Sequence, residues 1–118
     1  MRIVVVGASS GLGRCIGVGL GQAGEQVALL ARRRERITDA AAEAGNGAVA
    51  IECDATDAAK CKAAIDAAAE ALGGIDALVY TPGVGPLVRI EDLTPQQWHD
   101  VFDTNVVGAS VTTAAALP

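Results

Sequence analysis

The sequence has 118 residues, of which 51% are hydrophobic and 3% aromatic, and its formal net charge is −5. This length limits the chain to one domain, and its apolar fraction suffices for a buried core. The negative charge and the few aromatic side chains argue against a nucleic-acid binder, and no apolar run approaches the roughly 18 residues of a membrane span. No signal-peptide pattern precedes the first apolar run, so we expect a cytoplasmic protein.

The first strand and the turn after it are the most informative part of the chain. Residues 2–6 are a short β-branched run, which predicts a buried strand. The run ends in Gly7-Ala8-Ser9-Ser10-Gly11-Leu12-Gly13, a G-x-x-x-G-x-G turn. Gly7 would allow a sharp turn, Gly11 a close approach of a ligand, and Gly13 close packing of the next helix on the sheet. Because a helix start favours phosphate, this context predicts pyrophosphate binding over a purely structural turn.

A helix is predicted over residues 12–23, because apolar residues recur there at helical spacing. Leu12, Ile16 and Leu20 form the expected inward stripe. The same segment contains Gly17, Gly19 and Gly21, each of which costs roughly 0.5–1 kcal/mol relative to alanine in a helix. Close contact with a strand accounts for one or two of these glycines but not for all three.

A cluster of arginines follows the second predicted strand, residues 27–31. Four of the nine basic residues lie between Arg32 and Arg36, at the start of a helix predicted to run to Ala44. A solvated helix start is the plain interpretation, but cations there oppose the helix dipole, which indicates an anion outside the helix. In a βαβ dinucleotide site an acid after this strand holds the ribose 2′-hydroxyl, whereas an arginine suits a 2′-phosphate. The absence of an acid favours NADP over NAD.

The alternation of strands and helices continues to the end of the chain. Strands are predicted at residues 48–53 and 75–80, with a helix at 58–72 between them. These elements predict an α/β fold, a Rossmann-type doubly wound parallel sheet with strand order 3-2-1-4. The fourth strand would be a hydrophobic edge, which invites pairing with another chain or aggregation.

The last predicted helices begin at a clear N-terminal signal. Thr94 is the expected N-cap, Pro95 takes the first helical position, and Gln97 completes a capping box. The side chains expected to face inward on this helix are Trp98, Val101 and Phe102. A further helix is predicted from about Val106.

The cysteines and the single histidine indicate no metal site. Cys15, Cys53 and Cys61 contain no C-x-x-C pair, and their odd number without a secretion signal argues against a disulfide framework. Cys15 and Cys53 are expected to be small core residues. His99 has no ligand cluster beside it and is expected to be exposed.

These motifs resemble the short-chain dehydrogenase/reductase family, whose opening turn is usually T-G-x-x-x-G-x-G. Val6 stands where that family usually has threonine, so the hydroxyl that ties the turn down is missing. Tyr80-Thr81-Pro82-Gly83 stands where it usually has N-N-A-G, which removes two amides that brace the sheet and flank the cofactor ribose. Residues 93–108 strongly resemble its fourth helix, with Asn105 in the place of its asparagine.

The resemblance implies roles for particular residues. Arg32, and second Arg33, would hold the 2′-phosphate. Asp54 would accept from the adenine amino group with Ala55 against the ring; alternatively Asp54 caps the next helix, a role that Thr56 or Asp57 could fill equally well. The full set of expected cofactor-binding residues is Gly7, Ser9, Ser10, Gly11, Leu12, Gly13, Arg32, Arg33, Asp54, Ala55, Thr81 and Gly83.

Asn105 is the only expected member of the catalytic set. In the family this asparagine kinks its helix, and its carbonyl side holds a water of the proton relay; otherwise a mid-helix asparagine faces solvent or makes a local kink. The family's acid/base is a tyrosine four residues before a lysine, with a serine on the fifth strand. Here Tyr80 is the only tyrosine and Val84 follows it at that spacing, while Ser110 lies on the helix after Asn105.

We therefore expect residues 1–118 to be the N-terminal dinucleotide-binding part of a single Rossmann domain whose catalytic part is absent. The implied protein is an NADP-dependent oxidoreductase that transfers hydride between nicotinamide and a small carbonyl or alcohol substrate, and that forms homo-oligomers through the C-terminal helix. The 118-residue chain alone is expected to be inactive. The alternative is a non-catalytic dinucleotide-binding or interaction module.

Overall fold

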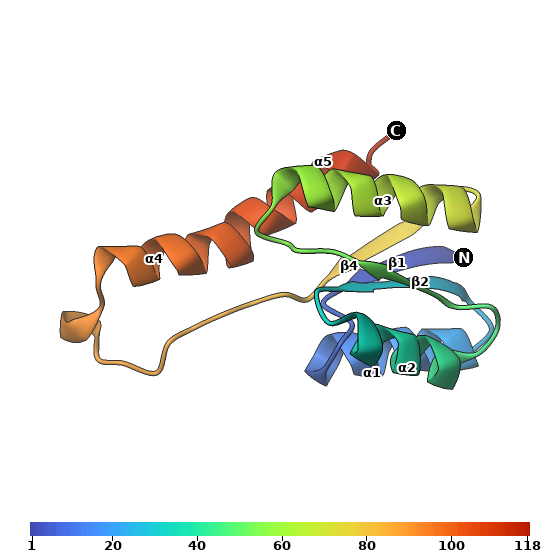
Figure 1. Ribbon diagram of the computed structural model, residues 1–118, viewed down its shortest axis with the longest axis horizontal. Coiled ribbons are helices and arrows are strands. Elements are labelled where there is room, and N and C mark those ends of the chain that lie inside the picture. The colour runs from blue at the N-terminus through green and yellow to red at the C-terminus, as the bar shows by residue number, and fades with distance from the viewer.

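A computed structural model describes all residues 1–118 and shows one parallel sheet between two layers of helices (Figure 1). The predicted strand order is confirmed, because the sheet runs β3-β2-β1-β4 and every pair is parallel. Helices α1 and α2 cover one face, and α3 and α5 cover the other (Figure 1). The elements are β1 (Arg2–Val6), α1 (Gly11–Gln22), β2 (Gln26–Ala31), α2 (Arg34–Ala44), β3 (Val49–Glu52), α3 (Ala58–Leu72), β4 (Ala77–Tyr80), η1 (Ile90–Asp92), α4 (Pro95–Phe102), η2 (Asp103–Val107) and α5 (Gly108–Ala116).

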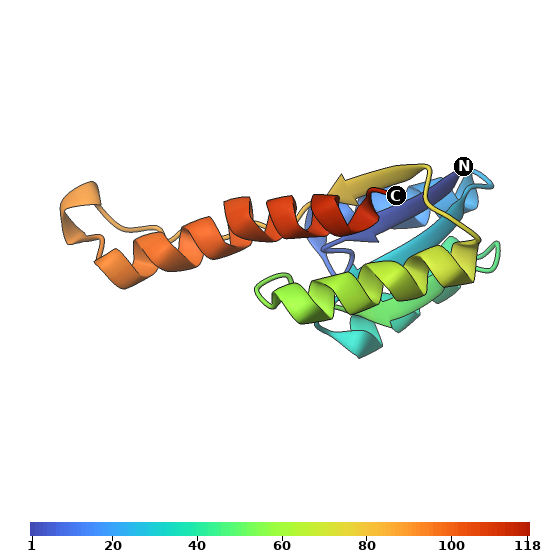
Figure 2. The ribbon, with the colours of Figure 1, turned by 90° about the horizontal axis from the view of Figure 1, so that it is seen from above.

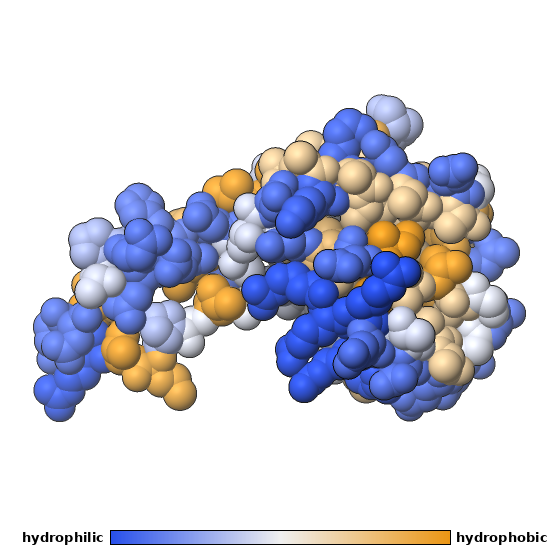
Figure 3. Space-filling model, viewed as in Figure 1, coloured by the Kyte–Doolittle hydropathy of each residue, from blue (hydrophilic) through white to orange (hydrophobic).

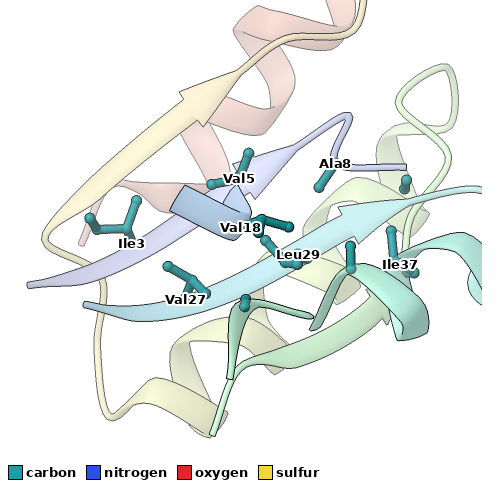
Figure 4. Close-up of a cluster of buried hydrophobic side chains, with 10 residues drawn as sticks. Ile3, Val5, Ala8, Val18, Val27, Leu29 and Ile37 are labelled. Atoms are coloured by element: carbon teal, nitrogen blue, oxygen red, sulfur yellow. The ribbon is translucent and has the colours of Figure 1, made fainter. Parts of the chain in front are cut away.

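Strand β1 lies inside the sheet, between β2 and β4, and contributes side chains to both hydrophobic cores. Val5 pairs with Leu29 of β2 and with Val79 of β4. Since successive side chains of a strand point to opposite faces, Val5 enters the core beneath α1 and α2, and Val4 the core beneath α3. Figure 4 shows the first of these cores. The continuous apolar run in β1 is thus explained by burial on both faces.

The inward stripe predicted for α1 is wrong at Leu12, whereas Ile16 and Leu20 pack against the core beneath the helix. Leu12 is 71% exposed, and Ile16 and Leu20 are only partly buried. Two glycines also lie on the inward face: a Cβ on Gly17 would lie 2.5 Å from Leu29 Cδ2 of the sheet, and one on Gly21 would lie 2.7 Å from Ala44 Cβ of α2. The helix can therefore approach the sheet and α2 closely because Gly17 and Gly21 have no side chains. A search for large apolar residues at helical spacing does not detect this kind of packing.

The burial of the cysteines agrees with the prediction for Cys53 but not for Cys15. Cys53 is buried as expected, but Cys15 is exposed, because the glycines occupy the inward face of its helix. Cys61 is fully buried, and its sulfur lies 4.0 Å from that of Cys53. Burial raises the pKa of Cys53 to about 12, so this residue is a neutral thiol at physiological pH.

Helix α4 and the loop before it project beyond the end of the sheet (Figures 1 and 2). The predicted capping box is present, with Thr94 accepting from Gln97 N and Gln97 accepting from Thr94 N. The inward orientation predicted for Trp98 and Phe102 is wrong: they are 44% and 51% exposed and stack on each other with ring centroids 6.3 Å apart. No strand lies beneath this segment, whose surface mixes apolar and hydrophilic atoms (Figure 3).

None of the helices combines the length and the apolar character that crossing a membrane requires.

Candidate cofactor site

A cleft of about 290 Å³ opens at the carboxyl ends of the strands. Ligands of open α/β sheets bind at this edge. All the expected cofactor-binding residues except Gly11 line it, namely Gly7, Ser9, Ser10, Leu12, Gly13, Arg32, Arg33, Asp54, Ala55, Thr81 and Gly83. Segments far apart in the sequence thus meet in one place.

The glycine turn presents a free helix start to the cleft. Gly7 adopts a positive φ of 84°, and the N–H groups of Gly7 and Ala8 donate to Leu30 O, which fixes the turn against β2. Ser10 is the N-cap of α1, yet its side chain makes no capping hydrogen bond, and the first turn has no acidic residue. The first N–H groups of α1 therefore have no side-chain acceptor and are available to an anion.

Thr81, the residue after β4, supplies the hydroxyl that is missing at Val6. Thr81 Oγ1 donates to Val6 O at 2.7 Å and lies 3.4 Å from Gly7 O. A Cβ on Gly7 would lie 2.5 Å from this hydroxyl, and a Cβ on Gly13 would overlap it. The turn is therefore bonded to the residue after β4, in the space that the two glycines leave. The sequence predicted that this contact would be missing.

Asp54 does not cap α3, a role that the sequence allowed for Asp54, Thr56 or Asp57. Asp57 caps α3, since its carboxylate accepts from Lys60 N at 3.1 Å. Thr56 donates to Asp54 Oδ1 twice, from its hydroxyl at 2.7 Å and from its backbone N–H at 3.0 Å. These bonds lower the pKa of Asp54, and the positive charges of Arg32 and Lys60 lower it further. Asp54 is held as a carboxylate whose Oδ2 makes no hydrogen bond within the protein.

Thr56→Val should raise the pKa of Asp54 toward its usual value, because the hydroxyl bond to the carboxylate is lost. A lowered folded-state pKa contributes stability above the unfolded value of about 3.9, and that stability disappears as the pH falls through the folded pKa. The variant should therefore lose part of this contribution at neutral pH. An NMR titration of the Asp54 carboxyl carbon measures the shift. Thr38→Val removes an exposed hydroxyl bonded to a carbonyl and is the control; an unchanged Asp54 pKa in Thr56→Val would contradict this account.

Arg32 and Arg33 line the cleft without forming an ion pair. Arg14, by contrast, pairs with Glu43 at 2.6 Å. Arg33 is the N-cap residue of α2 and makes no side-chain capping bond. Two exposed guanidinium groups at one end of the cleft are suited to an anion such as a phosphate.

Asn105 lies just outside the cleft lining, in the π-helix η2, so the predicted irregularity in its helix is present. Its side-chain Oδ1 accepts from Val84 N at 2.8 Å, and its Nδ2 donates to Val84 O at 2.9 Å. The side chain is thus engaged with the loop after β4. These bonds use one of the two acceptor sites of Oδ1 and one of the two N–H groups of Nδ2, so the side chain and the main-chain carbonyl of Asn105 can each still bind a water.

Several residues that line the cleft were not among the predicted cofactor-binding residues. They are Val6, Ala31, Cys53, Thr56, Pro82, Val84 and Thr104. The Asp-x-Thr spacing of Asp54 and Thr56 is typical of a local side-chain turn and could have identified Thr56. Thr104 and Val84 carry no such signal, because the fold alone brings them to the cleft.

Comparisons with known proteins agree with this geometry. The family profile described as "short chain dehydrogenase" matches residues 1–118. An uncharacterised oxidoreductase of Methylorubrum extorquens is 33% identical over 117 residues, which cover 96% of this chain and 47% of that protein.

Solved structures show the same arrangement. A short-chain type dehydrogenase/reductase from Mycobacterium marinum superposes with a TM-score of 0.91 at 32% identity, over 98% of this chain and 48% of that one. An alcohol dehydrogenase from the archaeon Thermococcus sibiricus, complexed with 5-hydroxy-NADP, gives 0.90 at 28% identity, over 97% and 50%. The chain spans about half the length of the relatives it matches.

Proposed function

Since this chain belongs to the short chain dehydrogenase family, we propose that residues 1–118 form the N-terminal dinucleotide-binding part of an NADP-dependent oxidoreductase. The proposed reaction transfers hydride between the nicotinamide and the carbonyl or hydroxyl carbon of a small molecule. The observation that carries the proposal is the cleft, where a free helix start, two unpaired arginines and an ionised Asp54 converge.

The residues of the cleft suit the parts of a dinucleotide in order. The N–H groups at the start of α1 would hold the pyrophosphate, with Ser9 and Ser10 beside it. Asp54 Oδ2 would accept from the adenine amino group. Thr81 and Gly83 would flank the nicotinamide ribose. When bound, the nicotinamide gives or takes the hydride, and the part of this chain is to bind and orient it.

Three further parts of the proposal extend beyond the cleft. Asn105 would serve the proton relay by holding a water. Self-association would use the C-terminal helix, at whose start Val106 and Val107 are exposed. The proposed location is the cytoplasm.

The preference for NADP over NAD is supported by the charge at the end of β2. The strand ends at Ala31, Arg32 follows it, and neither Arg32 nor Arg33 forms an ion pair with a carboxylate. A relative from Thermococcus sibiricus was solved with an NADP derivative. An arginine in this place suits a 2′-phosphate, which NAD lacks.

Arg32→Asp should shift the cofactor preference toward NADH. Loss of a charge-assisted hydrogen bond is worth about 1.5–3 kcal/mol, so the affinity for NADPH should fall about 10- to 100-fold, whereas that for NADH should hold or rise. Fluorescence titration with both nucleotides measures this. Arg36→Asp makes the same charge change outside the cleft lining and should leave the preference unaltered. Equal affinity of the unmodified chain for NADPH and NADH would refute the preference.

A further inference from the structure

Tyr80 makes a contact that the proposed cofactor-binding set does not include. It is the last residue of β4, and its hydroxyl donates to Thr104 O at 2.5 Å. Thr104 belongs to η2 and immediately precedes Asn105. A side chain at the end of a strand is therefore bonded to the backbone of the π-helix.

The Tyr80 hydroxyl has room to reach the Thr104 carbonyl because Gly108 beside it has no side chain. A Cβ on Gly108 would overlap the Tyr80 hydroxyl and lie 2.7 Å from Ala55 O. Strand β4, the loop after β3 and the start of α5 therefore meet at this point. The close approach lets a phenol reach a main-chain carbonyl inside a helix.

The π-helix needs such support more than an α-helix does. Its bonds run five residues along the chain, as in Gly108 N to Asp103 O, and this geometry occurs mostly as short insertions within α-helices. A carbonyl at such an insertion is displaced from the regular ladder, and Tyr80 gives Thr104 O a donor from outside the helix. Burial raises the pKa of Tyr80, so its phenol stays protonated and able to donate at neutral pH.

Asn105, the residue after Thr104, connects η2 to the cleft. Asn105 binds both the N–H and the carbonyl of Val84, and Val84 lines the cleft. The contacts form one series, from Tyr80 through Thr104 and Asn105 to Val84. The loop after β4 is thus held at its start by the strand and at Val84 by η2.

We propose that Tyr80 is a positioning residue, whose hydroxyl holds η2 in place and thereby keeps Asn105 bonded to the loop that borders the cleft. Its effect on cofactor binding rests on the proposed function. Its effect on the Asn105–Val84 contact does not.

Tyr80→Phe tests the inference, because it removes the hydroxyl and keeps the ring. Hydrogen exchange of the Val84 amide reports directly on its bond to Asn105 Oδ1. Exchange at Val84 should quicken about 3- to 10-fold, the range of one net hydrogen bond, while Val4 and Val5 in β1 keep their protection. Thr113→Val removes a hydroxyl bonded to a carbonyl on the exposed face of α5 and should leave Val84 unchanged.

A second variant separates positioning from general stability. In an Asn105→Ala background the Val84 amide has already lost its acceptor, so adding Tyr80→Phe should change its exchange no further. Unchanged Val84 exchange in the single variant would overturn the inference. So would faster exchange throughout β1, because the hydroxyl would then support the whole sheet rather than the loop.

Titration with NADPH distinguishes the inference from the function on which its last step rests. If the proposed function holds, Tyr80→Phe and Asn105→Ala should each weaken NADPH binding by a similar factor of about 3 to 10, as expected for one lost hydrogen bond. Failure of the unmodified chain to bind NADPH, with the Val84 effect intact, would refute the function and support the positioning role. Normal NADPH binding by the unmodified chain and by both variants would refute the link from Tyr80 to the cleft.

Discussion

Gly13→Ala is expected to abolish cofactor binding and to destabilise the folded chain. A Cβ at this position would overlap Gly7 O and Thr81 Oγ1, and it would do so at the turn that forms the wall of the cleft. A backbone carbonyl held by the sheet cannot move aside as a flexible side chain can. Forcing one extra carbon into such a contact costs about 1–3 kcal/mol or more, and Gly13→Val should cost more still.

The same helix contains a matched control. A Cβ on Gly19 would meet no atom within 4 Å, so Gly19→Ala should instead stabilise the chain by about 0.5–1 kcal/mol through helix propensity. Urea unfolding and NADPH titration on both variants give the comparison. If Gly13→Ala unfolds and binds like the unmodified chain, the close packing of the turn is not required.

Gly11→Ala separates binding from packing. Gly11 has a positive φ of 56° but open space around its Cβ position, and it does not line the cleft. An alanine there bears about 1–2 kcal/mol of left-handed strain yet collides with nothing in the protein. Since the predicted role of Gly11 is to let a pyrophosphate approach the turn closely, a Cβ there should obstruct the ligand rather than the fold. We therefore expect a folded variant with weakened NADPH binding; unchanged affinity would refute this role of Gly11.

The sheet could be predicted from sequence because its signals are local. β1, α2 and α3 have their predicted bounds, and the other strands differ by one or two residues at their ends. A strand buried on both faces reads as a continuous apolar run, and β–α alternation then fixes the topology. The predictions that failed concern which face a helix presents. In α1 the deciding residues have no side chain, and in α4 an amphipathic pattern has no sheet to face.

The candidate site, like the fold, could be predicted only where its signals are local in the sequence. Arg32 follows β2 directly and Asp54 comes two residues after the end of β3, so the topology brings them to one edge. The tie from Thr81 to Val6 and the contact from Tyr80 to Thr104 join residues that are 75 and 24 positions apart. Such contacts depend on exact side-chain placement, which neither spacing nor composition encodes.

The 118-residue chain is expected to reduce no carbonyl with NADPH. A general acid/base needs a pKa near the working pH, and the only tyrosine cannot supply it. Tyr80 is engaged with Thr104 O, burial raises its pKa, and the residue four positions on is Val84 rather than a lysine. Asn105 can position water but cannot exchange a proton at neutral pH. Binding of NADPH without turnover would also fit a non-catalytic module, so a form extended past Pro118 is the necessary comparison.

The same chain is expected to self-associate. β4 is an edge of the sheet, and exposed backbone donors and acceptors on an edge strand pair readily with another chain. Trp98 and Phe102 add exposed apolar surface on the projecting α4, and burying them in a contact is favourable. Phe102→Glu should lower the sedimentation coefficient toward that of an 11.8 kDa monomer, whereas His99→Glu, at an exposed position of the same helix, should have little effect.

One pair of measurements, sedimentation and a carbonyl-reduction screen with NADPH, tests both expectations on the short chain and on a longer form. In the longer form we expect a fifth strand beside β4 and, after it, a serine and a Tyr-x-x-x-Lys, since the relatives are about twice as long as this chain. That strand would cover the edge, and the tyrosine, with its pKa lowered by the lysine, would supply the proton. The longer form should therefore associate less through β4 and turn over substrate. A monomeric short chain with reductase activity would refute both arguments, because neither the uncovered edge nor the missing acid/base would then matter.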